Sequence, residues 1–181
     1  KLIALRDAPI VDPYTGPAIL SGSASGVFFH EIFGHRIEGQ RMKSDKDAQT
    51  FKKMIGEYVL PPHLQVFSDP TLKNYADQDM NGYYKYDDQG VKAERVDVVI
   101  DGHARADIGY DPVSRQSNLV VESSDPKTEE ELRQLLIAEI KKQGKDRGYF
   151  FKSVTGGFTM TNRRGANAFN VTPLEVYEVY A

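Results

Sequence analysis

One stretch of the sequence, Ser25–Gly39, limits what this chain can fold into more than any other. It contains two of the chain's four histidines, His30 and His35, among large apolar residues. Glu31 follows the first histidine directly, and Glu38 lies three residues after the second. On an ideal α-helix, where each residue advances by about 100°, these four side chains share one polar stripe about 140° wide. Apolar side chains fill most of the remaining circumference, which is the pattern of a buried helix.

The serines that precede this stretch offer N-caps, and we predict a helix over residues 24–38. Gly39 can close that helix in the left-handed conformation. Burying imidazoles and carboxylates without partners costs several kcal/mol. The polar stripe must therefore face a cavity, a metal ion or strong hydrogen-bond partners. This makes the helix the first candidate for a functional site.

The spacing of the two histidines leaves two interpretations open. Helix-borne zinc sites place their histidines four residues apart, about 40° around the helix, whereas His30 and His35 are five apart and diverge by about 140°. One metal ion can bind both only if the helix is locally distorted. A π-bulge would close most of the gap, and Gly34 has no side chain to obstruct it. The alternative is a pair of core histidines whose partners are Glu31, Glu38 and backbone carbonyls.

A long amphipathic helix is predicted over residues 128–143. Thr128 and Glu131 have the spacing of a capping box, and Gly144 supplies a stop signal. Four apolar residues recur at helical spacing along it: Leu132, Leu135, Leu136 and Ile140.

Short apolar or alternating runs between turn residues predict the strands. They cover residues 2–5, 18–20, 64–67, 91–100, 117–122, 149–154 and 174–180. A short helix is expected over 47–55, and the glycine- and asparagine-rich segment 156–170 is expected to be a connection. Because strands outnumber helices and do not alternate with them regularly, we predict an α+β fold. Its sheets are expected to be mixed and mostly antiparallel, with the buried histidine helix and the long amphipathic helix packed on them.

Composition excludes several classes of function. The net charge is −3, and lysines and arginines are scattered, so nucleic-acid binding is not expected. No apolar run approaches the roughly 18 residues of a membrane span. The chain has no cysteine, which rules out disulfides and thiolate ligands from these residues.

The histidine stretch resembles the signature of the TldD/PmbA family, annotated historically as modulators of DNA gyrase and regarded as metallopeptidases. TldD-type subunits carry a histidine pair in the pattern H-E-x-x-x-H followed by x-x-E-G, which Gly26–Gly39 matches. Four other stretches agree with the family, so the resemblance runs nearly end to end: Pro13–Pro17, Asp87–Val91, Arg115–Asn118 and Gly156-Gly157 leading to Phe169–Tyr180.

The resemblance implies that His30 and His35 bind zinc and that Glu31 is the general base acting on a zinc-activated water. It also implies a third ligand, a cysteine downstream of residues 174–180, which this chain does not contain. We therefore expect the zinc site of this chain alone to be empty or weakly loaded.

The family match also makes four further residues candidates for shaping the site. They are Gly34, Glu38, Arg115 and Asn118. An ion pair between Arg115 and Glu38 would be an equally good structural use of these two residues.

The resemblance further implies a zinc-dependent peptidase acting on unfolded or extended peptides in a homo- or hetero-oligomer with a TldD/PmbA-like subunit. The alternative is a non-catalytic peptide-binding or scaffolding subunit of such a complex. Residues 1–181 are expected to be a single domain, a piece of the family's C-terminal catalytic domain. What lies before Lys1, after Ala181 and near Gly102-His103 is open, and a cytoplasmic location is the family-based expectation, with an earlier signal peptide left open.

Overall fold

A computed structural model describes residues 2–38, 51, 53–104, 117–156, 158–161, 167–170 and 172–181. Gly39, Arg115 and most of the helix expected over 47–55 lie outside the described residues. What the sequence indicates about them stays a prediction.

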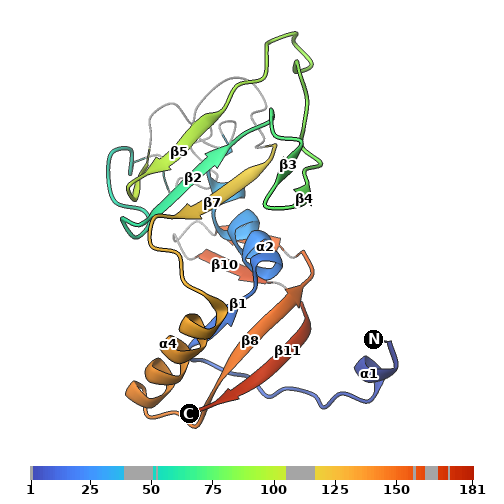
Figure 1. Ribbon diagram of the computed structural model, residues 1–181, viewed down its shortest axis with the longest axis vertical. Helices are drawn as coiled ribbons and strands as arrows, with labels where there is room; N and C mark the ends of the chain where they lie inside the picture. The colour runs from blue at the N-terminus through green and yellow to red at the C-terminus, as the bar shows by residue number, and fades with distance from the viewer. Residues whose placement is uncertain are drawn as a thin grey trace.

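Two sheets form most of the described fold (Figure 1). The first has the strand order β6-β5-β2-β7, with β2 at Leu64–Ser68, β5 at Val96–Ile100, β6 at His103–Ala104 and β7 at Leu119–Ser123. The second has the order β1-β8-β11, with β1 at Ala18–Leu20, β8 at Arg147–Val154 and β11 at Pro173–Tyr180. Two hairpins accompany them: β3 (Asn74–Tyr75) with β4 (Gln78–Asp79), and β9 (Phe158–Thr161) with β10 (Asn167–Asn170).

Antiparallel pairing dominates these sheets. Among the described strands, β1 and β8 form the one parallel pair, in which Ala18 lies opposite Tyr149. Strand β2 pairs antiparallel with both β5 and β7, and β11 pairs antiparallel with β8. The predicted α+β class with mixed, mostly antiparallel sheets is therefore confirmed.

The histidine helix lies between the two sheets (Figure 1). It is divided into α2 (Gly22–Ile32) and a 3₁₀ turn, η1 (Gly34–Arg36). Phe33 and Ile37, on either side of that turn, are 3% and 1% exposed, and both belong to a hydrophobic core cluster with β2 and β5. Burying two large apolar side chains fixes the turn against the first sheet.

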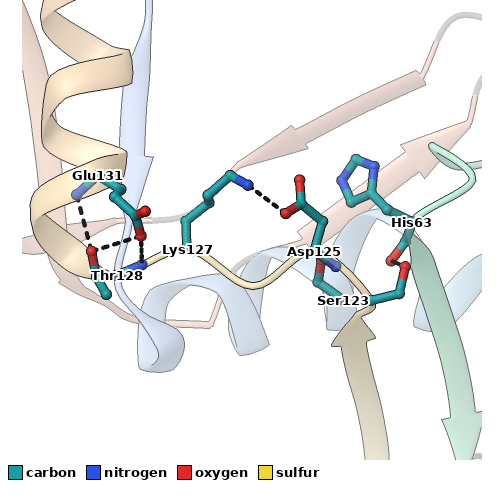
Figure 2. Close-up of polar contacts among 7 residues, drawn as sticks. His63, Ser123, Asp125, Lys127, Thr128 and Glu131 are labelled. Carbon is teal, nitrogen blue, oxygen red and sulfur yellow. Dashed lines mark hydrogen bonds and ion pairs between the residues drawn. The ribbon is translucent and has the colours of Figure 1, made fainter.

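The amphipathic helix α4 (Glu129–Lys142) begins where the sequence predicts. Figure 2 shows its capping box, in which the Thr128 backbone N–H donates to Glu131 Oε2 at 2.7 Å and the Glu131 N–H donates to Thr128 Oγ1 at 3.2 Å. Leu136 and Ile140 pack with Val179 of β11 in a second core cluster. The buried face is narrower than the apolar stripe in the sequence, because Leu132 and Leu135 are exposed.

Three parts of the strand prediction are wrong. The strand expected over 91–100 covers only Val96–Ile100 (β5). Residues 2–5 form part of a helix, α1 (Leu2–Arg6), and not a strand. All of α1 is exposed, and a short helix satisfies its backbone locally where a strand would need a partner. Segment 156–170 is not only a connection, since it contains the hairpin of β9 and β10.

Candidate metal centre

The start of α2 is fixed to the second sheet through Ser21. Its side-chain oxygen accepts a hydrogen bond from the Ala24 N–H at 3.2 Å, so Ser21 is the N-cap. The same hydroxyl donates to the Lys152 carbonyl at 2.6 Å, and the Ser21 N–H donates to the Phe151 carbonyl at 2.9 Å. Strand β8 therefore determines where the histidine helix begins.

The helix changes its winding between the two histidines. The α-helical part ends at Ile32, and the Phe33 N–H donates to the Phe29 carbonyl at 3.0 Å. A 3₁₀ turn follows, in which the Arg36 N–H donates to the Phe33 carbonyl at 2.9 Å. The single regular helix predicted over 24–38 is therefore wrong, and so is the π-bulge as the form of its distortion. The winding becomes tighter, not wider, because a 3₁₀ turn has about three residues.

This break brings the two imidazoles together. The ring centroids of His30 and His35 are 4.5 Å apart, and the ring planes meet at 70°. Divergent rings on a regular helix would have argued against a shared metal ion, and this arrangement removes that objection. Gly34 is the first residue of the 3₁₀ turn. It lies between the two histidines in sequence, and it is buried.

Two buried carboxylates flank His35. Glu38 Oε1 lies 2.9 Å from His35 Nδ1, and Glu31 Oε2 lies 3.8 Å from His35 Nε2. The Glu31 and Glu38 side chains are 5% and 3% exposed, whereas the His35 side chain is 21% exposed and His30 is exposed. The carboxylates are thus more buried than the imidazoles. Imidazoles that solvent can reach suit a site that must admit a ligand.

His30, Glu31 and His35 together form a group that could hold a metal ion. One ligand atom from each lies within 4.8 Å of the others. Ligand atoms of a tetrahedral zinc ion, each about 2.1 Å from the metal, lie roughly 3.4 Å apart, so the observed spacing is somewhat wider. Two imidazoles and a carboxylate are also a donor set found in catalytic zinc sites. The residues present therefore fit a metal ion.

Arg36, which the sequence analysis did not select, directly follows His35. Its Nε is buried and has no hydrogen-bond partner among the described residues. Burial lowers the pKa of the Arg36 guanidinium. On an ideal helix Arg36 falls outside the polar stripe, on the apolar side, and a cation in that position was the sequence signal that could have drawn attention to it.

Asn118 directly precedes β7, and its side chain bonds to the segments that follow β2 and β4. Its Oδ1 accepts a hydrogen bond from the Gly82 N–H at 2.8 Å. Its Nδ2 donates to the Asp69 and Leu72 carbonyls at 3.2 and 3.1 Å. These bonds fasten the loop after β2 to the first sheet. A part for Asn118 in shaping the metal site stays a prediction.

Comparison with known proteins places the chain in a family. Residues 13–106, just over half of the chain, match the PmbA/TldA metallopeptidase C-terminal domain. The chain therefore belongs to the PmbA/TldA (TldD/PmbA) metallopeptidase family.

Its relatives agree with this assignment. The chain is 28% identical over 180 residues to a metalloprotease of Methanocaldococcus jannaschii, an alignment that covers 88% of this chain and 36% of the relative. It is 31% identical over 86 residues to a metalloprotease TldD homolog of Haemophilus influenzae, covering 48% of this chain and 16% of the relative. The matched part thus spans little more than a third of these proteins at most.

Solved structures share the fold. TldE from Thermococcus kodakarensis superposes with a TM-score of 0.60 at 14% identity, covering 91% of this chain and 38% of that one. A Thermotoga maritima protein described as a candidate modulator of a DNA gyrase gives a TM-score of 0.60 at 18% identity, covering 98% of this chain and 42% of that one. Within the described part of the chain, no helix has the length and apolar character that crossing a membrane requires.

Proposed function

We propose that this chain forms the metal-binding part of a zinc-dependent peptidase. The observation that carries the proposal is the convergence of His30, Glu31 and His35 across the break between α2 and η1. Membership of a metallopeptidase family supports hydrolysis as the class of reaction. The imidazole donors favour zinc over hard cations such as Mg²⁺ and Ca²⁺. The choice of zinc among the metals that imidazole binds follows the family resemblance.

In this proposal His30 and His35 are metal ligands and Glu31 is the general base. A zinc ion bound there would supply a Lewis acid and a nucleophile available near neutral pH. The Glu31 carboxylate would accept a proton from the attacking water and return it to the leaving amine. The Glu31 side chain is only 5% exposed, so surrounding protein groups fix the position of its carboxylate.

The chain's own donors leave the proposed site incomplete. Catalytic zinc sites use three protein ligands, and Glu31 cannot serve fully as both ligand and base. Following the family resemblance, we assign the third ligand to a cysteine outside these residues, which contain none. Residues 1–181 are accordingly proposed to be part of the family's C-terminal catalytic domain, which alone would hold zinc weakly.

The proposed substrates are unfolded or extended peptides, and the proposed assembly is an oligomer with a TldD/PmbA-like subunit. The assembly is proposed from the family resemblance, and TldE shares the fold. Gly34, Glu38, Arg115 and Asn118 are proposed to shape the site. A cytoplasmic location stays a prediction.

A second candidate function is a non-catalytic, peptide-binding or scaffolding subunit. The 2.9 Å contact between His35 Nδ1 and Glu38 Oε1 favours it, because that contact satisfies an imidazole without any metal ion. In that case the histidine helix is kept for stability.

Metal analysis and peptide cleavage by the full-length protein separate the two candidates. The peptidase predicts bound zinc and loss of cleavage in Glu31→Gln, a change that keeps the side chain's shape. Glu139→Gln on α4, whose carboxylate pairs with Lys142 far from the histidines in sequence, is the matched control and should cleave normally. Cleavage that survives Glu31→Gln, or a wild-type protein without zinc or cleavage, would reject the catalytic role.

A further inference from the structure

The contact between Glu38 and His35 assigns different tasks to the two nitrogens of one imidazole. Glu38 Oε1 lies 2.9 Å from His35 Nδ1, which is hydrogen-bond distance. On the opposite side of the ring, Nε2 is directed to Glu31, whose Oε2 is 3.8 Å away. The His35 ring therefore lies between two carboxylates. Its Nδ1 contacts Glu38, and its Nε2 lies on the side of Glu31, a member of the candidate metal group.

The backbone holds Glu38 in this place. Ile37, the residue before it, is 1% exposed in the core cluster. The Ile37 N–H donates to the Phe33 and Gly34 carbonyls, both at 3.2 Å. The Glu38 side chain is itself 3% exposed, so its carboxylate has little freedom to leave His35.

Hydrogen-bond chemistry then selects the tautomer of His35. An ionised carboxylate only accepts hydrogen bonds, so the 2.9 Å contact requires the proton on Nδ1. In a neutral imidazole the other nitrogen, Nε2, then carries the free lone pair. That lone pair is on the side of Glu31 and can bind a metal ion.

We propose that Glu38 is a positioning residue that fixes His35 in the Nδ1–H tautomer and so makes Nε2 its metal-binding atom. Carboxylates that orient metal-ligating histidines in this way are a general feature of protein metal sites. The metal-binding half of this inference rests on the proposed function. The tautomer half does not, because it concerns the metal-free protein.

A merely structural Glu38 would behave differently. An i,i+3 contact that only stabilises the 3₁₀ turn would change the free energy of unfolding when it is removed. It would leave the zinc affinity of the folded protein unchanged. The tautomer of His35 therefore tests the contact itself, and the zinc affinity tests the positioning role.

The first experiment determines the protonated nitrogen of His35 by long-range ¹H–¹⁵N NMR on the metal-free, full-length protein. We expect Nδ1–H in the wild type and in Glu38→Gln, whose amide oxygen can still accept. In Glu38→Ala we expect a shift toward Nε2–H. Nε2–H in the wild type overturns the proposal even if neither variant folds, and so does an unchanged tautomer in a folded Glu38→Ala protein.

The second experiment measures Zn²⁺ affinity by competition with a chromophoric chelator. We expect about a 10- to 100-fold loss in Glu38→Ala, a smaller loss in Glu38→Gln and none in the control Glu139→Gln. Zinc binding that is equally tight in folded Glu38→Ala overturns the positioning role and leaves the proposed function standing. A wild type that binds no Zn²⁺ but has Nδ1–H at His35 rejects the proposed function and the metal half of the inference together, and only the tautomer half stands.

Discussion

His30 and His35 are five residues apart in sequence, yet their imidazole rings meet edge to face with centroids 4.5 Å apart. A continuous α-helix would separate them by about 140°. The change from α-helix to 3₁₀ turn after Ile32 makes the difference. The core residues on either side of that turn are what hold it, so the site depends on packing beneath it.

Replacing Ile37 with alanine should therefore destabilise the protein and loosen the site together. The side chain is 1% exposed, and truncating a buried isoleucine to alanine costs about 2–5 kcal/mol. Urea unfolding of the full-length protein measures the change. Ile55→Ala, at a residue that is 46% exposed, should change the free energy of unfolding by only about 0.5 kcal/mol. Equal effects of the two substitutions would contradict the packing described here.

Thr128→Ala should weaken helix α4 by removing the hydroxyl of its N-cap. N-cap threonines typically contribute about 1 kcal/mol, and Thr128→Ser should keep most of that. The backbone N–H and hydroxyl of Thr128 lower the pKa of Glu131 from its ordinary value of 4.5. The lowered pKa of Glu131 adds to the free energy of unfolding. This contribution is present above pH 4.5 and is lost as the pH falls through the lowered pKa. The difference between the unfolding midpoints of wild type and Thr128→Ala should therefore shrink in acid, where the bond from the hydroxyl to the carboxylate is lost. The part that comes from the Glu131 N–H bond to the hydroxyl should remain. A difference that does not change with pH would count against the capping box.

The contribution of Tyr75 to the free energy of unfolding should depend on pH in the alkaline range. Its hydroxyl donates to Glu122 Oε1 at 2.5 Å, and this bond raises the pKa of Tyr75 to about 12. Because the folded-state pKa lies above the unfolded value of 10, the stabilisation is complete below pH 10 and is lost as the pH rises toward 12. Tyr75→Phe should thus destabilise the protein at pH 8 and much less near pH 12. Tyr86→Phe, which is 62% exposed, is the control and should show no such trend.

Asn118→Ala should be costly although it removes a small side chain. Asn118 is 5% exposed, and its amide bonds the Gly82 N–H and the carbonyls of Asp69 and Leu72. Leaving buried polar groups unpaired costs roughly 1–3 kcal/mol each, so we expect a total of about 2–4 kcal/mol in urea unfolding. The exposed Asn74→Ala should lose far less. A loss of zinc affinity in folded Asn118→Ala would in addition support a part in shaping the site.

Local sequence rules predict the parts of this fold whose bonds are local. The Thr128–Glu131 capping box marks the start of α4 because both of its hydrogen bonds lie within one turn. Strand β1 occurs at residues 18–20 as expected, and β11 at Pro173–Tyr180 is one residue longer than expected. Their apolar patterns are short but are bounded by clear turn residues.

The parts that sequence does not predict depend on distant partners. Segment 2–5 has the apolar character of a strand, but it has no neighbouring strand among the described residues and forms a helix. The hairpin of β9 and β10 forms in a segment rich in glycine and asparagine, where propensity argues against strands. For the site, spacing indicated that a distortion was needed, but its 3₁₀ form follows from how Phe33 and Ile37 pack on β2 and β5.

Zinc content of the purified full-length protein tests the central claim most directly. Wild type and His63→Ala, a change at an exposed histidine in the loop before β2, should each hold one zinc ion per chain. His30→Ala and His35→Ala should each lose it while remaining folded. Zinc retained in both of these variants, or absent from a wild type supplied with zinc, would contradict the account.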